Sequence, residues 1–372
     1  MTNIPETMTA ALTLGHGGLD MIEVRDGVPV PVPGPGEVLI RVLACGANNT
    51  DINTRTGWYS RTVTDGTSAE GGTSGFATAE GRDGSWGRAG ISFPLIQGAD
   101  VCGRIVAVGE DVAPEVIGER VLIDTWLRDW DDPLNMEKCG YFGSECNGGY
   151  AEYTVAPITN VHTVESELSD VELATFATSS ITAENLLVRA DVGEGDVVLI
   201  SGASGGVGSA LIQLVRRRGA VPVAMAAAAK ADQVAALGAE AVIDREPPDL
   251  GQTLMDAIGR DTVDVVADVV GGPMFPQFIE VLARGGRYTC AGAIAGPMVE
   301  LDLRTFYLKN LTFTGATVIP PGLFGTLIGY IERGEIAPVV AETFPLAEIH
   351  TAQEAFLAKR HVGNIVIVPP EE

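Results

Sequence analysis

The hydrophobic residues of this chain follow two different patterns, and the change between them lies near Leu168. Before about residue 160, apolar runs of strand length are separated by frequent glycine and proline. Examples are Glu37–Ala44, Cys102–Gly109 and Glu119–Ile123, and Pro33–Gly36 is a turn sequence. This punctuation is typical of short strands joined by turns. We therefore expect a β-rich, barrel-like domain in this part of the chain.

Beyond Leu168, apolar strands alternate with helical stretches, which predicts an α/β domain with a parallel doubly wound sheet. The strands are expected at 197–201, 221–225, 241–244, 263–268, 286–291 and 311–315.

The end of the chain predicts one helix over Ala347–Arg360 and one strand over Asn364–Val368. We expect both to pack on the first domain and to make it discontinuous. The predicted division is residues 1–165 with 318–372 for the β-rich domain, and 166–317 for the α/β domain.

The segment Arg61–Gly90 fits neither pattern, because it is rich in Gly, Ser and Thr. It is expected to be a long loop, and such loops are functional or disordered. Trp58, Tyr59 and Trp86 lie at or near its ends. They either line a flat apolar site or belong to the core.

The most informative motif is the glycine-rich stretch Ser201–Gly208, between the strand Val197–Ile200 and a helix over Ser209–Arg218. In such a unit the backbone N–H groups and the helix dipole point at a phosphate, and missing side chains let a pyrophosphate approach. This predicts a dinucleotide site; the alternative is a purely structural turn. The predicted contact residues of the turn are Ala203, Ser204, Gly205, Gly206, Val207 and Gly208.

The residues after the next strand bear on the choice of dinucleotide. NAD sites usually carry an acidic residue there for the ribose hydroxyl, but none occurs from Ser209 to Ala231. Lys230 is present instead, and a lysine attracts the 2′-phosphate that a carboxylate would repel. The pattern favours NADP(H) over NAD(H). The alternative interpretation of Lys230 is a solvated lysine at a helix start.

Two later strands end in the turns Gly271-Gly272 and Gly292-Ala293. Ligands of doubly wound sheets bind at the carboxyl edge of the strands. We therefore expect Gly271, Gly292 and Ala293 to border the nicotinamide, although plain tight turns would have the same sequence.

The composition excludes several classes. A formal charge of −25 over 372 residues argues against nucleic acid, whose phosphates require a basic face. No apolar run reaches the roughly 20 residues of a membrane span, and the N-terminus lacks signal-peptide features. Five scattered cysteines fit reduced thiols. We expect a cytoplasmic protein.

Several motifs together resemble the medium-chain dehydrogenase/reductase superfamily. Apart from the glycine turn they are Pro33–Val38, Gly98–Gly109, Gly118–Val121, Gly148–Tyr153, Ala236–Ala239 and Val362–Val366. The resemblance implies a Rossmann coenzyme domain and a GroES-like catalytic domain. It also places Asn364 at a cofactor-contact position where lysine is common.

The resemblance makes zinc the decisive question. Zinc-dependent members bind the catalytic metal at three positions that are Asn48, Ala99 and Thr178 here. Amide, methyl and hydroxyl groups do not replace the thiolate, imidazole or carboxylate ligands of zinc. The four-cysteine structural site is reduced to Cys139 and Cys146, which cannot close a tetrahedral site. We therefore expect no zinc.

What remains resembles the zinc-independent quinone oxidoreductase branch, through Gly46–Asp51 and Arg55–Tyr59. Without a metal, the candidates for stabilising the developing oxyanion are the Asn48 amide and the Thr50 or Tyr59 hydroxyl. Thr50 is equally consistent with a helix N-cap. Asp51 is expected to position the loop rather than to react.

The leading hypothesis is an NADPH-dependent reductase that transfers hydride to a quinone, an enone or a related carbonyl. One alternative is an alcohol or aldehyde dehydrogenase with an unrecognised metal arrangement, and another is a non-catalytic NADPH-binding protein. The apolar last strand of the doubly wound sheet, around Leu311–Gly315, predicts pairing between copies. We expect a homodimer or a homotetramer built on dimers.

Overall fold

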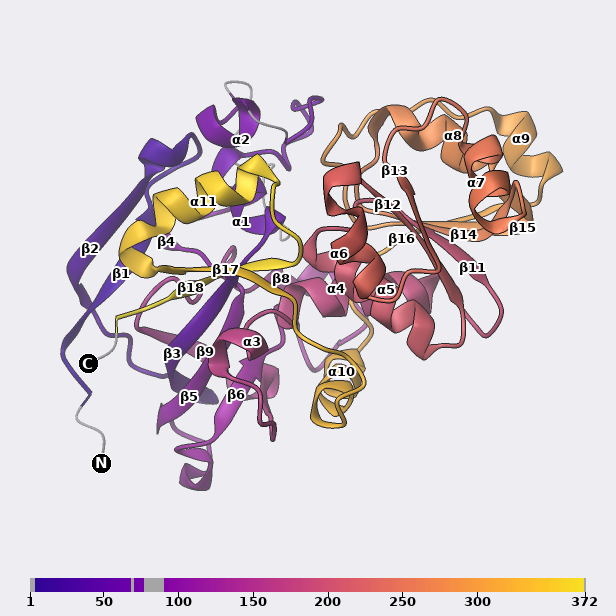
Figure 1. Cartoon of the computed structure of the whole chain (residues 1–372). Helices are drawn as coiled ribbons and strands as arrows, with labels where there is room; N and C mark the ends of the chain where they lie inside the picture. Colours follow the sequence, from indigo (N-terminus) through magenta and orange to yellow (C-terminus); the bar gives the residue numbers. More distant parts are fainter. Residues whose placement is uncertain (1–3, 68–69, 77–89, 371–372) are drawn as a thin grey trace.

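The computed structural model describes residues 4–67, 70–76 and 90–370. It has two lobes: an indigo-to-purple one, on which the C-terminal segment also packs, and a red-to-orange one (Figure 1). We refer to them as the catalytic lobe and the coenzyme lobe.

The catalytic lobe is built mainly on antiparallel β-structure, with β17 and β18 as a parallel pair. A seven-stranded sheet has the order β10-β6-β5-β3-β18-β17, with β9 also paired to β3, and a three-stranded sheet has the order β2-β1-β4. The strands of this lobe are β1 (Thr7–Thr13), β2 (Ile22–Pro29), β3 (Glu37–Ala47), β4 (Leu95–Ile96), β5 (Asp100–Val108), β6 (Arg120–Ile123), β7 (Trp126–Leu127), β8 (Gly140–Tyr141), β9 (Tyr153–Pro157), β10 (Val161–Thr163), β17 (Val340–Pro345) and β18 (Asn364–Val368).

The coenzyme lobe holds a six-stranded sheet of order β13-β12-β11-β14-β15-β16, in which every pairing is parallel. Its strands are β11 (Val197–Ile200), β12 (Val221–Ala226), β13 (Ala241–Asp244), β14 (Val263–Asp268), β15 (Leu282–Cys290) and β16 (Thr312–Gly315). All four residues of β11 are buried, as expected for a central parallel strand covered on both faces. The predicted doubly wound sheet and the β-rich domain are both confirmed.

The helices cover the sheets and connect the lobes. They are α1 (Asn49–Thr56), α2 (Glu70–Ser74), α3 (Asp170–Leu173), α4 (Ala177–Arg189), α5 (Gly206–Arg217), α6 (Ala231–Ala236), α7 (Leu250–Ile258), α8 (Phe275–Glu280), α9 (Leu303–Leu308), α10 (Leu323–Glu332) and α11 (Ile349–Ala358). In the described part of the chain, none is long and apolar enough to cross a membrane.

The C-terminal segment returns to the catalytic lobe. Strand β18 pairs antiparallel with β3, with Ile365 opposite Ala47 and Ile367 opposite Cys45. Figure 1 shows α11 and β18 in yellow over the purple strands. The predicted return of the tail is therefore confirmed, while the domain boundaries themselves stay a prediction.

The insertion differs from the expectation of one long loop. Residues Glu70–Ser74 form the short helix α2, so the prediction is wrong for this part. Most of the remaining insertion, including Trp86, lies outside the described residues.

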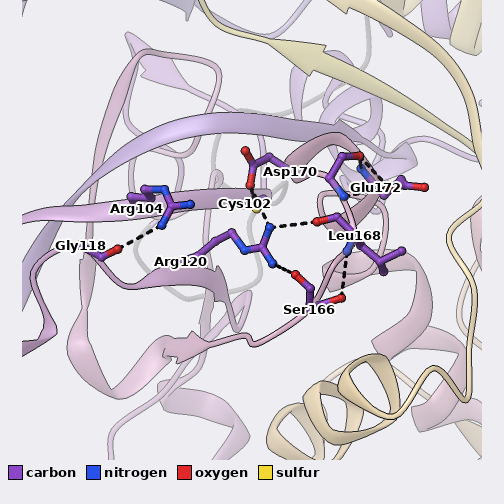
Figure 2. Close-up of polar contacts among 9 residues, drawn as sticks. Cys102, Arg104, Gly118, Arg120, Ser166, Leu168, Asp170 and Glu172 are labelled. Atoms are coloured by element: carbon purple, nitrogen blue, oxygen red, sulfur yellow. Dashed lines mark hydrogen bonds and ion pairs between the residues drawn. The ribbon is translucent and has the colours of Figure 1, made fainter.

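A polar cluster fixes the chain where it leaves the catalytic lobe (Figure 2). Arg120 of β6 donates to the carbonyls of Ser166 and Leu168 and pairs with Asp170 at 3.6 Å. The buried Cys102 thiol donates to the same carboxylate, at 3.7 Å, and burial raises the pKa of this thiol. The connection to α3 is thereby held against β5 and β6.

Candidate active site

The glycine-rich stretch Ser201–Gly208 follows β11, and its last three residues already belong to α5, which begins at Gly206 and not at the predicted Ser209. A Cβ on Gly208 would lie 2.3 Å from the Gly202 carbonyl oxygen, so close packing of the turn requires glycine there. A Cβ on Gly205 would meet only the Gly202 oxygen, at 3.6 Å, so the surroundings of Gly205 are open. Open backbone at a helix N-terminus fits the pyrophosphate of a dinucleotide.

Lys230 lies against this turn. Its Nζ donates to Ser204 Oγ at 3.2 Å and to the carbonyls of Lys359 and His361 at 2.7 and 2.8 Å. Partial burial, with a smaller contribution from Arg245, lowers the pKa of Lys230. The ammonium group is thus held beside the turn rather than extended into solvent.

Asn364 brings the catalytic lobe to the start of α5. Its Oδ1 accepts a hydrogen bond from Ser179 Oγ at 2.8 Å, and a Cβ on Gly206 would lie 2.2 Å from the same oxygen. The neighbouring Gly363 donates its backbone N–H to the Ser204 carbonyl, at 2.9 Å. Both lobes therefore contribute to this part of the cleft.

A buried carboxylate that sequence reasoning missed organises the carboxyl edge of the sheet. Asp268, the last residue of β14, accepts hydrogen bonds from the hydroxyls of Ser201 and Tyr288 and from the Gly271 N–H. It thereby ties together the ends of β11, β14 and β15. An acid directly after the apolar run Val265–Ala267 is the signal that could have revealed it.

The predicted nicotinamide-side turns pack together at this edge. Gly271 has φ +62°, which favours glycine, and a Cβ there would lie 3.1 Å from Ala293 Cβ. A Cβ on Gly292 would lie 2.9 Å from the Val269 carbonyl oxygen. The turns after β14 and β15 are therefore neighbours.

On the catalytic lobe, two polar atoms at the start of α1 have no partner. The Asn48 side chain is 7% exposed, and its Nδ2 makes no hydrogen bond to the described residues. The same holds for the buried Oγ1 of Thr50. Buried polar groups are nearly always paired, so two unpaired donors two residues apart indicate a polar ligand.

The N-cap of α1 is not Thr50, which was one interpretation of that residue from the sequence. The N-cap of α1 is Asn48, so Thr50 is the second residue of the helix and is not its cap. The Asn48 N–H donates to the Asp51 carboxylate at 2.8 Å, while the Asn48 side chain lies toward Ser179, with 3.4 Å between Oδ1 and Oγ.

Asp51 accepts three hydrogen bonds, from Asn48 N, Gly98 N and Tyr150 OH, at 2.8, 3.2 and 2.8 Å. Burial raises the pKa of Asp51 to about 6, although these donors oppose the shift. Because both carboxylate oxygens of Asp51 accept hydrogen bonds from the protein, this side chain is suited to holding the start of α1 in place.

Tyr59 and Trp58 follow the other end of α1. An eight-residue helix spans about 12 Å, so the structure separates Tyr59 from Asn48 by roughly that length. The two rings form an edge contact at 5.6 Å, and Trp58 Nε1 donates to the Asp65 carbonyl at 2.8 Å. Burial raises the pKa of the Tyr59 phenol.

The three positions that the resemblance assigns to zinc, Asn48, Ala99 and Thr178, lie near Asp100, a residue that sequence reasoning missed. Asp100 Oδ1 accepts the Thr178 N–H at 2.6 Å, and Thr178 Oγ1 lies 2.9 Å from the Tyr141 hydroxyl. Burial raises the pKa of Asp100 to about 7, although the neighbouring Thr178 and Asn48 oppose the shift. Its signal was an acidic residue beside the position of Ala99.

The amide, methyl and hydroxyl groups of Asn48, Ala99 and Thr178 are not among the usual zinc ligands, which are thiolate, imidazole and carboxylate. Over residues 4–67, 70–76 and 90–370, no three His, Cys, Asp or Glu side chains form a group that could hold a metal ion. Cys139 and Cys146 are both free thiols.

Comparisons with known proteins agree with this two-lobe arrangement. Residues 34–166 match the model of the alcohol dehydrogenase GroES-like domain, and residues 206–333 match that of the zinc-binding dehydrogenases. Human quinone oxidoreductase is 25% identical over 355 residues, covering 93% of both chains. The acryloyl-coenzyme A reductase of Metallosphaera sedula is 27% identical, covering 97% of this chain and 99% of that protein.

One solved structure is considerably more similar. It is a Sinorhizobium meliloti 1021 protein, named only provisionally as an alcohol dehydrogenase. The two chains are 46% identical and superpose with a TM-score of 0.89, over 100% of this chain and 99% of the other.

Proposed function

We propose that this chain, which belongs to the medium-chain dehydrogenase/reductase superfamily and is an NAD(P)H-dependent oxidoreductase, works without zinc. Its proposed reaction is the reduction of a quinone, an enone or a related carbonyl with NADPH. The observation that carries this proposal is the chemistry at the three metal positions. An amide, a methyl and a hydroxyl group stand there, and the amide Nδ2 of Asn48 is a buried donor without a partner among the described residues.

Lys230 supports the preference for NADPH. Its ammonium group lies 3.2 Å from Ser204 Oγ, within the turn that is expected to hold the pyrophosphate. A cation at this place attracts the 2′-phosphate of NADPH. NADH lacks that phosphate and gains nothing from the contact.

The reduced nicotinamide supplies the hydride when the coenzyme is bound. The chain's part is to hold the acceptor and to stabilise the negative charge that develops on its oxygen. Asn48 Nδ2 and Thr50 Oγ1 are donors for that oxygen, because both are buried and without partners in the described part of the chain. Asp51 keeps the start of α1 in place through the Asn48 N–H. Tyr59, at the far end of α1, is a wall residue for larger acceptors.

Acceptors that delocalise charge suit this site best. A quinone or an enone spreads the incoming charge over several atoms and needs less stabilisation than a simple ketone. An alcohol dehydrogenase activity is the second candidate, favoured by the provisional name of the 46% identical protein. It would require a metal bound through residues other than those at the three family positions.

Steady-state kinetics and metal analysis of the untagged protein test the proposal. We expect NADPH oxidation with 1,2-naphthoquinone or an enone, activity that survives chelation, and substoichiometric zinc. About one zinc per chain, together with loss of activity on chelation, would favour the alcohol dehydrogenase. Tight NADPH binding with no turnover of any acceptor class would indicate a non-catalytic protein.

A further inference from the structure

A pocket of about 410 Å³ lies between the insertion and the coenzyme lobe. It is lined on one side by Asp65 and its neighbours, and on the other by residues that follow β14 and β15. This volume falls within the range of small-molecule sites, roughly 300–1,000 Å³.

Backbone contacts between the two lobes lie beside this pocket. The Thr67 N–H donates to the Ile294 carbonyl at 3.0 Å. A Cβ on Gly66 would lie 2.5 Å from that same oxygen, so only glycine allows the approach. Gly272, with φ +68°, packs on Ala295 in the same way, because its Cβ would lie 2.8 Å from Ala295 Cβ. Figure 1 shows the purple segment near α2 reaching toward the orange loops of the coenzyme lobe.

Part of the pocket lining follows directly in sequence on the turns that are expected to border the nicotinamide. Gly272 and Ala295 line it, and they follow by one and two residues the turn residues expected to border the nicotinamide, Gly271 and Ala293. On the other side, the hydrogen bond from Trp58 Nε1 to the Asp65 carbonyl connects the pocket wall to the end of α1. An acceptor held at the start of α1 and longer than the helix can extend toward this pocket.

The lining is apolar with an acidic edge. Pro273, Pro276, Met298 and Val299 supply apolar surface, and Met298 is 71% exposed, so a ligand can remove it from water. Asp65 and Glu300 are the charged side chains of the described lining, which contains no lysine or arginine. Phosphate or carboxylate groups would be repelled there.

We propose that this pocket binds an uncharged, apolar tail of the acceptor, so that the preferred substrates are long-chain or bulky neutral carbonyl compounds and not phosphate-bearing thioesters. The inference rests on the proposed function, because it assumes that the acceptor carbonyl lies at Asn48.

A chain-length series tests the proposal in turnover. With NADPH, we expect kcat/KM for trans-2-tetradecenal to exceed that for trans-2-butenal by about ten-fold, mainly through KM. Met298→Asp should reduce this ratio at least three-fold, because it places a third carboxylate beside the tail. Met255→Asp, at a half-exposed methionine of α7 outside the pocket, is the matched control and should keep the wild-type ratio. Equal ratios in all three proteins would overturn the proposal.

A binding experiment separates this inference from the proposed function. Calorimetry on the NADPH complex compares pentadecan-2-one with 14-oxopentadecanoate, which carries a carboxylate at the end of its tail. We expect pentadecan-2-one to bind at least ten-fold more tightly, and Glu300→Lys to narrow the difference in affinity. Equal affinity for the two probes refutes the pocket assignment even if enones are reduced. A clear preference for pentadecan-2-one supports the pocket even if no acceptor turns over.

Discussion

Asp100 Oδ1 accepts a hydrogen bond from the backbone N–H of Thr178 at 2.6 Å, which joins β5 to the first turn of α4. Asp100 is 1% exposed, and burial raises its pKa to about 7. The nearby Asp51 charge also raises this pKa, while Thr178 and Asn48 oppose the shift. The Asp100 carboxyl also lies in the electrostatic surroundings of Tyr141, Tyr150 and Cys45.

This raised pKa predicts a pH-dependent stability. Between the ordinary aspartate pKa of 3.8 and the raised pKa of about 7, the folded protein keeps a proton on Asp100 that the unfolded chain releases. The free energy of unfolding therefore falls as pH rises through this window, by up to about 1.4 kcal/mol per pH unit from this group. Asp100→Asn keeps an acceptor oxygen for Thr178 and should reduce the slope by up to that amount.

Urea unfolding at several pH values between about 4.5 and 7.5 measures this slope. The control is Asp232→Asn, at an exposed carboxylate of α6, which should keep the wild-type slope. Asp51 and Asp124 also have raised pKa values, so some slope remains in Asp100→Asn. An unchanged slope in Asp100→Asn would mean that this carboxyl is ionised throughout the range.

Lys230 provides the test of coenzyme preference. We expect Lys230→Ala to weaken NADPH binding about ten-fold, or roughly 1–2 kcal/mol, because a charge-assisted contact to the 2′-phosphate is lost. NADH affinity should change little, since it has no such phosphate. Fluorescence titration of both coenzymes measures this, with Lys138→Ala at a remote surface ion pair as the control. Equal binding of both coenzymes to the wild-type protein would contradict the preference.

The sequence was most informative where periodicity and backbone requirements leave few choices. The strand Val197–Ile200 and the glycine turn follow from apolar patterning and from the space that a Cβ would need. Asp100 and Asp268 were missed, because what distinguishes them is burial and long-range partners, which no local pattern encodes. The pocket at Asp65 likewise depends on a contact between segments more than 200 residues apart.

The open edge of the coenzyme sheet predicts self-association. Among the described residues, β16 pairs only with β15, and the adjacent α9 exposes large apolar side chains. Leu303, Tyr307 and Leu308 are 64%, 60% and 57% exposed. We expect a dimer that buries this face, and Leu308→Asp should weaken it. Sedimentation velocity at micromolar concentration measures the mass, with Met255→Asp as the control. A wild-type monomer of 38.8 kDa would refute the expectation.

Asn48 provides the most direct test of the proposed chemistry. Its Nδ2 makes no hydrogen bond to the described residues, while its Oδ1 accepts a long hydrogen bond of 3.4 Å from Ser179 and the residue forms a capping box with Asp51 at the start of α1. We expect Asn48→Ala to lower kcat/KM for quinones and enones about ten-fold or more, with little change in thermal midpoint or NADPH affinity. Loss of a donor that acts on a developing oxyanion costs about 10²–10³ where the charge is localised, and less where it is spread over a conjugated system.

Two further variants locate the acceptor along α1. Thr50→Val keeps the side-chain volume but removes Oγ1, the second donor at the start of α1 that has no partner among the described residues. We expect this variant to lower kcat/KM as Asn48→Ala does. Tyr59→Phe should have a smaller effect, because its phenol lies at the far end of the helix. Full activity in Asn48→Ala and Thr50→Val across quinones and enones would place the acceptor oxygen elsewhere. A clearly lower thermal midpoint in both variants would instead mean that these side chains stabilise α1.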